Sequence, residues 1–241
     1  MYHLPLTLET PAANLALDEA LLDAAVEGQL PGEVLRLWEP TDFFVVLGRS
    51  SKVAEIHAAA CRQDNVAVLR RPSGGATILT GPGCLMYALL LDAERRPELR
   101  SVDRAHELVL GTIERALAPF ASGIARHGTS DLTIPAAHAG DPPVKFSGNS
   151  LRLRRGHLLY HGTILYDFPL ERIEEWLADP ARRPDYRGAR GHRQFVTNLP
   201  ATRATLESAL TAAWKANEPL INGPRDRTNQ LAASRYSTVE W

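Results

Sequence analysis

Lysine is scarce in this chain, and so is any excess of positive charge. The 241 residues include 27 lysines and arginines, of which three are lysines (Lys52, Lys145 and Lys215), against 28 acidic residues, so the formal net charge is −1. The chain therefore lacks the basic surplus with which nucleic-acid-binding proteins neutralise phosphates. We attribute the arginine bias to composition at solvated positions. Each lysine gains interest, because an ammonium and a guanidinium differ chemically.

Cysteines and long apolar runs are also few. The two cysteines, Cys61 and Cys84, have no metal-ligand spacing and make no disulfide framework, which is typical of a reducing compartment. The longest apolar run, residues 84–91, is far shorter than the ~20 residues that span a bilayer. The N-terminus has neither the basic start nor the apolar core of a secretory signal. We therefore predict a cytoplasmic protein that binds neither membrane nor nucleic acid.

What is present fits one folded domain over residues 1–241. The hydrophobic share of 44% and the charged share of 23% are ordinary for a globular chain. Runs of strands interrupted by helices, without regular βαβ alternation, predict an α+β fold around a mixed sheet. Predicted strands cover residues 34–38, 43–47, 66–70, 76–80, 84–91, 131–134, 145–146 and 149–165, the last broken by a turn at 155–156. Predicted helices cover residues 11–26, 53–61, 102–118, 173–177 and 205–214.

The first predicted helix begins at a Thr-Pro pair, residues 10 and 11, which is a typical N-cap followed by proline at the first helical position. Its spacing places Leu15, Glu19 and Leu22 near one face. Asp18 and Asp23 are predicted to turn elsewhere.

The segment Arg70-Arg71-Pro72-Ser73-Gly74-Gly75-Ala76-Thr77 is the first candidate site. Glycines after a strand let the backbone approach a ligand, and their N–H groups can converge on an anion. The arginines offer a planar fork for carboxylate or phosphate. The segment is neither a Walker A loop nor a dinucleotide fingerprint. Taken alone, it is equally consistent with a tight turn.

Lys145 is the second candidate, because it lies between Val144 and Phe146 at the start of a strand, close to a glycine. A lysine in that position can point into a cleft and stabilise a developing oxyanion or phosphate. The alternative is a solvated lysine on an edge strand.

His161 is the third candidate, since it shares a strand face with His157 and Leu159. No other ligand cluster supports a zinc site, so we predict no metal centre. The default interpretation is a hydrogen-bonded structural histidine.

Residues 182–193 carry five arginines and form the fourth candidate. Such a segment could clamp a triphosphate, receive an acidic partner or contact RNA, and the plain alternative is a solvated flexible loop. RNA is the weakest of these, because the nearby aromatic residues are limited to Tyr186 and Phe195.

Taken in order, seven segments resemble the lipoate-protein ligase A family, within the wider biotin/lipoate ligase and octanoyltransferase group. The resemblance runs from about residue 10 to residue 200 and covers most of the chain. It implies the catalytic-domain fold of the biotin/lipoate ligases, with a largely antiparallel mixed sheet flanked by helices. The matching segments are residues 14–19, 37–38 with 48–49, 64–66 leading into 70–75, 130–132, 145–148, 161–163 and 196–199.

The resemblance also implies an activity: lipoate or octanoate reacts with ATP and Mg²⁺ to give an acyl-adenylate, and the acyl group passes to a lysine of a lipoyl domain. Lys145 matches the essential lysine of the family, which contacts the acyl carbonyl and the phosphate. The apolar strands at residues 45–47 and 85–90 are expected to wall a tunnel for an eight-carbon chain. The substrate- and nucleotide-binding residues implied are Arg71, Ser73, Gly74, Gly75, Ala76, Thr77, Ile78, Leu79, Asp131, Ser147, Gly148, His161, Gly162 and Thr163.

The motifs depart from the ligase pattern in places. Ala76 stands where the ligases usually have a third glycine, and Thr80-Gly81 where they have His-Asp. Residues 81–83, Gly-Pro-Gly, are instead similar to the octanoyltransferase branch. That branch works through a cysteine thioester, and neither the segment before Asp131 nor the region some thirty residues after the lysine holds a cysteine. Cys84 either lines the pocket or is a small buried hydrophobic residue.

Three functions follow from these features. The preferred one is an ATP-dependent lipoate-protein ligase. The alternatives are an octanoyl or lipoyl transferase with an acyl-carrier or lipoyl-protein donor, and a non-catalytic lipoate-binding module. The accessory C-terminal domain of full-length ligases is not expected within residues 1–241, so a separate accessory subunit is a possible partner.

Overall fold

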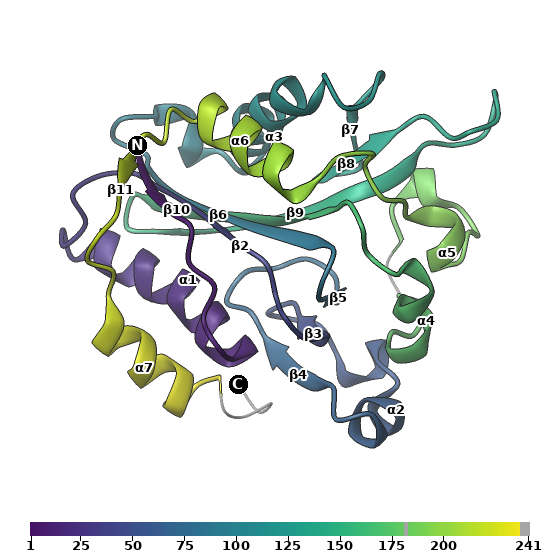
Figure 1. The fold of residues 1–241 in the computed structure, drawn as a ribbon, viewed down its shortest axis with the longest axis horizontal. Helices are drawn as coiled ribbons and strands as arrows, with labels where there is room; N and C mark the ends of the chain where they lie inside the picture. The colour runs from purple at the N-terminus through teal and green to yellow at the C-terminus, as the bar shows by residue number, and fades with distance from the viewer. Residues whose placement is uncertain (181–182, 237–241) are drawn as a thin grey trace.

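The computed structural model describes residues 1–180 and 183–236 (Figure 1). Arg182, one of the five arginines in the late segment, lies outside the described residues. Within the described part, a larger sheet has eight strands in the order β11-β1-β2-β6-β10-β9-β8-β7. A smaller sheet has three strands in the order β4-β3-β5.

The larger sheet is antiparallel from β2 through β6, β10, β9 and β8 to β7, whereas β1 runs parallel to β2 and β11. In the smaller sheet, β3 is parallel to β4 and antiparallel to β5. The predicted α+β class with a mixed, largely antiparallel sheet is confirmed. The strands are β1 (Tyr2–Leu4), β2 (Val34–Trp38), β3 (Phe44–Leu47), β4 (Ala67–Arg70), β5 (Ile78–Thr80), β6 (Cys84–Asp92), β7 (Ala125–His127), β8 (Asp131–Ile134), β9 (Val144–Arg154), β10 (His157–Leu165) and β11 (Glu218–Pro219).

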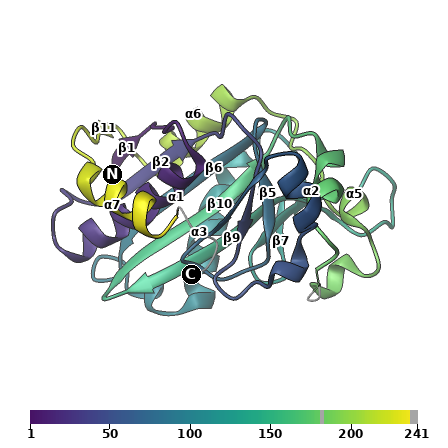
Figure 2. The same ribbon diagram turned by 90° about the horizontal axis from the view of Figure 1, so that it is seen from below.

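Helices cover both faces of the larger sheet. α3 (Val102–Leu117) and α6 (Arg203–Ala213) lie on one face, and α1 (Pro11–Val26) and α7 (Arg225–Ser234) lie on the other (Figure 1). Seen from below, the smaller sheet is on the same side as α1 and α7 (Figure 2). Three short helices lie at the opposite end of the molecule from α7: α2 (Ala58–Gln63), α4 (Ile173–Trp176) and α5 (His192–Phe195).

The apolar core is divided between these layers. One cluster joins β2, β6 and β10 to α3 and α6. A second contains Leu15 of α1 and Val46 of β3 together with Met86 of β6 and Leu165 of β10. This second cluster holds the smaller sheet against the larger one, because it draws side chains from both.

The predicted start of the first helix is confirmed, since the Thr10 hydroxyl accepts a hydrogen bond from the backbone N–H of Ala13 (3.1 Å). The prediction of one helix over residues 53–61 is wrong. A 3₁₀ turn (Val53–Glu55) and α2 are separated by extended backbone at Ile56, which pairs with Leu177. This pairing with a distant segment overrides the local helical preference.

Asp18 and Asp23, which were predicted to turn away from the face of Leu15 and Leu22, are both buried, because α1 lies between the sheet and α7 and is buried along most of its length. Asp18 binds Arg36 (2.5 Å), and Asp23 pairs with Arg154 of β9 and with Arg227 of α7. Arg36 is fully buried, which contradicts the expectation that the arginines occupy solvated positions.

The sequence patterns did not predict the short strands β1, β7 and β11, nor α5 and α7. Each short strand obtains its hydrogen bonds from a neighbouring strand, so its own sequence carries little signal. No helix in the described residues is both long and apolar enough to cross a membrane.

Candidate active site

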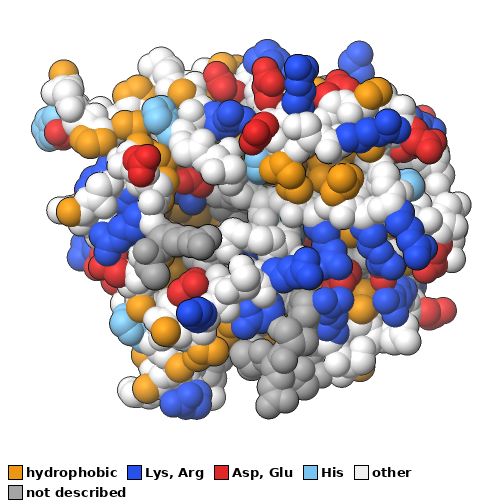
Figure 3. Space-filling view, turned by 180° about the vertical axis from the view of Figure 1, so that it is seen from behind, with side chains coloured by type: hydrophobic (Ala, Val, Ile, Leu, Met, Phe, Trp, Pro, Cys, Tyr) orange, Lys and Arg blue, Asp and Glu red, His pale blue; other side chains and the backbone are white. Residues whose placement is uncertain are grey.

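A cavity of about 730 Å³ is lined by α1, by strands of both sheets and by the loops that join them. This volume lies within the range of pockets for small molecules and cofactors, about 300–1,000 Å³. The face turned away in Figure 1 is hollowed, and Lys and Arg side chains gather to one side of the hollow (Figure 3).

Lys145 forms an ion pair with Asp131 at this cavity. Its Nζ lies 2.7 Å from Asp131 Oδ1, and the two side chains are 24% and 14% exposed. Gly148 leaves room for the ammonium, because a Cβ at that position would lie 2.8 Å from Nζ. An ammonium has three hydrogen-bond donors and Asp131 takes one, so donors remain for a ligand in the cavity.

The backbone around Lys145 is irregular, and the irregularity fixes its direction. A shift of register between Leu132 and Thr133 of β8 leaves Phe146 of β9 without a partner across the ladder. Bulges of this kind redirect side chains beside functional sites. Phe146 is fully buried in the core, while its neighbour Lys145 reaches the cavity. The backbone N–H of Thr197, from the motif at residues 196–199, donates to the Lys145 carbonyl (2.8 Å) and holds this turn of the strand.

Arg71 shapes the glycine-containing loop from the inside. Its Nη2 donates to the carbonyls of Gly74 (2.6 Å) and Ala76 (2.9 Å), and the side chain is only 6% exposed. Burial lowers the pKa of Arg71 to about 10, and the charge of Glu55 opposes this, so the guanidinium stays charged near neutral pH. Gly75 has a φ of +87°, a left-handed conformation that favours glycine. The loop backbone that faces the cavity is therefore held in place before any ligand binds.

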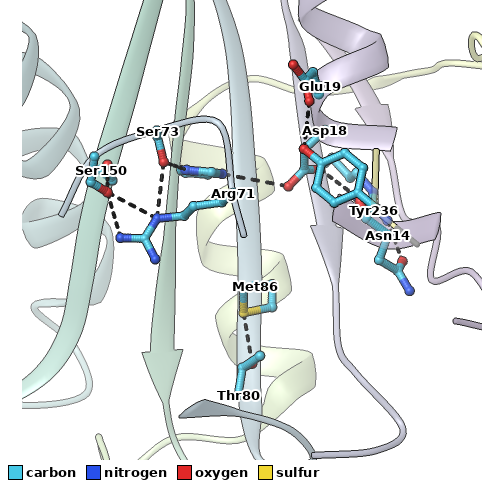
Figure 4. A network of polar contacts seen from close by, with 12 residues as sticks. Asn14, Asp18, Glu19, Arg71, Ser73, Thr80, Met86, Ser150 and Tyr236 are labelled. Carbon is cyan, nitrogen blue, oxygen red and sulfur yellow. Dashed lines mark hydrogen bonds and ion pairs between the residues drawn. The ribbon is translucent and has the colours of Figure 1, made fainter. Parts of the chain in front are cut away.

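His161 of β10 connects this loop to α1 through Ser73 and Asp18, which are both labelled in Figure 4. Its Nε2 lies 2.5 Å from Ser73 Oγ, and its Nδ1 lies 3.8 Å from Asp18 Oδ2. Ser73 Oγ also accepts a hydrogen bond from Arg71 Nε (3.2 Å). The other oxygen of Asp18 accepts a hydrogen bond from Arg36, so His161 lies between two residues that are themselves held in place.

Serine, histidine and aspartate follow one another here as they do in a hydrolase triad. The serine, however, is buried, whereas the nucleophile of a hydrolase must be accessible to its substrate. Ser73 is 1% exposed and is absent from the cavity lining, so it is not presented to a substrate. The series instead fixes the orientation of His161, which does line the cavity.

The apolar part of the lining includes Leu15, Val46, Ile78, Met86 and Tyr87, from α1, β3, β5 and β6, together with Phe195 of α5. Of the predicted tunnel strands, residues 45–47 contribute Val46, and residues 85–90 contribute Met86 and Tyr87. The rest of their apolar side chains pack into the core.

Neither cysteine lines the cavity. Cys84 is fully buried, with its Sγ 3.9 Å from the Met86 Sδ, and burial raises its pKa to about 12. Cys61 is 2% exposed and lies in the cluster under the smaller sheet. Of the two readings of Cys84, the buried hydrophobic one is therefore confirmed, and the thiol is not available as a nucleophile.

The structure brings ten of the fifteen predicted site residues to the cavity. The other five support it: Ser73 bonds His161, Gly74 accepts from Arg71, and Thr77 Oγ1 donates to Glu55 Oε2 (2.5 Å). Leu79 and Ser147 are buried beside it. The ten that line the cavity are Arg71, Gly75, Ala76, Ile78, Asp131, Lys145, Gly148, His161, Gly162 and Thr163.

The carboxylates and the amide of the lining that were not among the predicted site residues are Asp18, Glu55 and Asn149. Asp18 was in a matching motif, but the helical spacing was taken to turn it away from the face of Leu15 and Leu22. Glu55 was placed in a helix. Burial raises its pKa, but hydrogen bonds from Thr77 and other neighbours outweigh this and lower the pKa overall, so it stays ionised. Asn149 follows the lysine motif directly, which is the signal that could have found it.

The late arginine segment is not the solvated loop of the plain interpretation. Arg190 Nη2 donates to the Tyr186 carbonyl (2.6 Å), and Arg190 Nη1 donates to the Pro143 carbonyl (3.0 Å). Arg187 and Arg190 each donate from Nε to the carbonyl of the other (3.0 Å), and Arg187 is 4% exposed. These two arginines therefore hold the segment together, and Arg187 also lines the cavity. Arg183 lines the cavity and pairs with Asp179 (3.0 Å).

Across the described residues, no group of three or more His, Cys, Asp or Glu side chains is arranged to hold a metal ion. The expected absence of a metal centre stays a prediction. Magnesium is expected only as the counter-ion of ATP, and therefore as part of a substrate.

The fold and the cavity together define a class of site: a small-molecule cavity with both apolar and charged residues in its lining, among them the Lys145–Asp131 pair. Comparison with known proteins agrees with this class. The model of the lipoyl protein ligase A/B catalytic domain matches residues 10–212. The chain belongs to this family, whose members include lipoate ligases and octanoyltransferases.

Relatives carry both activities. The chain is 28% identical over 262 residues to octanoyltransferase LipM of Geobacillus kaustophilus, with 96% of this chain and 93% of the relative covered. It is 24% identical over 189 residues to a probable lipoate-protein ligase A of Mycoplasma pneumoniae, with 78% and 52% covered. Both names occur within the family that the domain model identifies.

Solved structures agree on the fold. A bi-partite lipoate protein ligase from Thermoplasma acidophilum, studied with its E2 lipoyl domain, superposes with a TM-score of 0.78 at 20% identity, covering 100% of this chain and 96% of its own. A lipoate-protein ligase A bound with ATP gives 0.75 at 20% identity, covering 100% and 97%. At 20% sequence identity, these two structures show that the chain shares their fold.

Proposed function

We propose that this protein is a lipoate-protein ligase, which activates lipoate or octanoate with Mg-ATP and transfers the acyl group to a lysine of a lipoyl domain. The observation that carries the proposal is the content of the cavity: its lining includes the Lys145 ammonium, paired with Asp131, and also Lys52, but no thiol. A transferase that works through a thioester needs a reactive cysteine, and both cysteines are buried.

The chemistry has two steps. A carboxylate oxygen of the acid attacks the α-phosphorus of ATP, and pyrophosphate leaves. The amine of the acceptor lysine then attacks the acyl carbonyl, the C–N bond forms, the bond to AMP breaks, and the amine gives up one proton. Negative charge develops on the carbonyl oxygen and on the departing phosphate, where the Lys145 ammonium would stabilise it.

Other residues of the cavity have supporting roles in this proposal. The backbone of Gly75 and Ala76, held by Arg71, would contact the nucleotide or the acyl carboxyl group. Leu15, Val46 and Met86 would contact the eight-carbon chain. As the split ligase of Thermoplasma acidophilum illustrates for that protein, we include a separate accessory subunit among the expected partners.

The test is the choice of acyl donor. One reaction contains apo lipoyl domain, lipoate and Mg-ATP, and the other contains apo lipoyl domain and octanoyl carrier protein without ATP; the mass of the domain is read in both. We expect an increase in the first reaction. An increase in the second reaction alone would falsify the ligase proposal.

The second candidate is an octanoyl or lipoyl transferase. Its support is the likeness to LipM over nearly the whole chain and the Gly81-Pro82-Gly83 turn. Because no thiol lines the cavity, this candidate requires direct transfer from the donor to the acceptor amine. If calorimetry shows lipoate binding while neither reaction modifies the domain, a non-catalytic lipoate-binding module is the remaining interpretation.

A further inference from the structure

Tyr186 connects the late arginine segment to the ion pair of Lys145. Its hydroxyl donates to Asp131 Oδ2 (2.8 Å), while Asp131 Oδ1 lies 2.7 Å from the Lys145 Nζ. The two oxygens of this carboxylate therefore have separate partners, one from β9 and one from a 3₁₀ turn (Asp185–Arg187) about forty residues further along the chain.

The ring of Tyr186 is held on several sides. Its centroid lies 5.3 Å from that of His127 and 5.2 Å from that of Phe195. The Tyr186 carbonyl accepts a hydrogen bond from Arg190, which also stacks on Phe195 at 5.3 Å. Three elements therefore fix the direction of the hydroxyl: β7, α5 and the turn itself.

The hydroxyl also keeps its proton. Burial, and next the charge of Asp131, raise the pKa of Tyr186 far above its usual value. The phenol is consequently a hydrogen-bond donor throughout the pH range in which an acyl-transfer enzyme works.

We propose that Tyr186 is a positioning residue for the acyl-transfer step: it fixes the orientation of Asp131 and thereby the place of the Lys145 ammonium. The proposal rests on the proposed function. Nothing in the sequence motifs or in the names of the relatives assigns a role to this tyrosine.

The physical reason lies in how the ammonium is shared. When an acyl carbonyl or a phosphate binds, Lys145 divides its donors between the ligand and Asp131. A carboxylate with one partner can rotate about its Cβ–Cγ bond and follow the ammonium. A carboxylate whose second oxygen is held by a fixed phenol cannot rotate in this way. The ammonium charge of Lys145 therefore stays where the transition state needs it.

The first experiment is a double-mutant cycle on acyl transfer, with Tyr186→Phe, Asp131→Asn and the double variant. The Phe variant keeps the stacked ring and removes only the hydroxyl. We expect kcat to fall roughly tenfold with little change in the KM for lipoate, since placement and not binding is lost. In the Asp131→Asn background, Tyr186→Phe should lower kcat very little further, because the hydroxyl acts through the carboxylate that this background lacks.

Tyr166→Phe is the matched control. The Tyr166 hydroxyl donates to Glu39 Oε2 at 2.7 Å, a half-buried tyrosine–carboxylate bond outside the cavity lining. It should leave kcat unchanged. An equal loss from Tyr186→Phe in both backgrounds, or no loss in the native background, overturns the positioning role.

A second readout does not depend on the reaction. The chain has three lysines, so partial acetylation followed by mass spectrometry gives the reactivity of Lys145 against that of Lys215. We expect Tyr186→Phe to raise the relative labelling of Lys145 severalfold, because a loosened ion pair releases the amine. Asp131→Asn should raise it at least as much, with no further increase in the double variant. If the native protein transfers no acyl group, the proposed function fails while this measurement still decides the positioning; unchanged labelling overturns it.

Discussion

Two cation–carboxylate pairs each bring a carboxylate to the cavity, and they are built differently. Asp18 of α1 binds Arg36 of β2, with 4% and 0% of the side chains exposed. Asp131 binds Lys145, with 14% and 24% exposed. The first pair is enclosed by protein, and the remaining donors of the Arg36 guanidinium have acceptors of their own, such as the carbonyl of Leu6. The second keeps free donors toward the cavity.

The difference between the two pairs explains why a lysine, and not an arginine, occupies position 145. A guanidinium has five donors in a rigid plane and is weakly hydrated, so it suits a closed position surrounded by acceptors. An ammonium is a compact charge on a flexible stem, which can exchange one acceptor for another as a ligand arrives. The Arg36 pair therefore holds the fold, and the Lys145 pair is suited to chemistry.

The largest effect should come from breaking the buried pair. Arg36→Met leaves Asp18 buried without its cation, and we expect a loss of about 3–5 kcal/mol in the free energy of unfolding, measured by urea denaturation. The double variant Asp18→Leu/Arg36→Met should recover most of this loss, because a buried pair can be replaced by apolar side chains. A loss below about 1 kcal/mol in the single variant would contradict the contrast between the pairs.

The next effect concerns activity and not stability. Lys145→Ala should lower acyl transfer by about 10²–10³-fold, the usual cost of removing one donor from a developing oxyanion, while the urea midpoint stays near that of the native chain. Lys145→Arg should fail as well, because a planar fork cannot place one compact charge at the same point. The exposed Lys215→Ala is the control. Near-normal turnover by the arginine variant would rule out the proposed role.

A smaller effect should come from filling the space beside the ammonium. In Gly148→Ala the new methyl group would lie 2.8 Å from the Lys145 Nζ, which is the end of a flexible side chain and moves aside. We expect roughly a tenfold fall in transfer through this displacement, with little loss of stability. Steady-state rates check the expected fall in transfer, and a thermal melt checks that stability is kept. A variant that unfolds would show that the backbone, and not the lysine side chain, had moved.

The most gradual effect is a pH dependence at Cys84, a buried ionisable group. Because burial raises its folded pKa to about 12 from a usual value of 9.0, the thiol is protonated in the folded chain while the unfolded chain ionises. Its contribution to stability is complete below about pH 9 and is lost as the pH rises toward 12, by at most about 1.4 kcal/mol per pH unit. Unfolding free energies between pH 8 and 11 should fall less steeply in Cys84→Ala. Equal slopes would show that the thiol does not titrate in this way.

Much of the fold was readable from local patterns. The Thr10-Pro11 pair predicted the start of α1, and the alternation around Gly156 predicted the β9–β10 hairpin. The helix predicted over residues 53–61 failed at Ile56, because a bridge to Leu177 competes with the helix there. Such a bridge joins residues more than a hundred positions apart, and no local pattern contains it.

The site divides in the same way. The motifs identified Lys145, Asp131 and His161, and the cavity contains all three. They did not identify Tyr186, because its role depends on meeting Asp131 from a distant turn. Asp18 was in a motif and was still misjudged, since its burial depends on meeting Arg36 of β2 and on the packing of α1 against the larger sheet.

The sequence by itself determined the fold class, the family and the lysine around which the chemistry is proposed, because each of these is written in residue types at short spacing. The tertiary structure decided which charges are structural and which remain available. Burial, the number of acceptors around a cation and the approach of distant segments set the strength of an ion pair, and these are properties of three-dimensional packing. For this chain that distinction separates Arg36, which is fully enclosed, from Lys145, which faces the cavity.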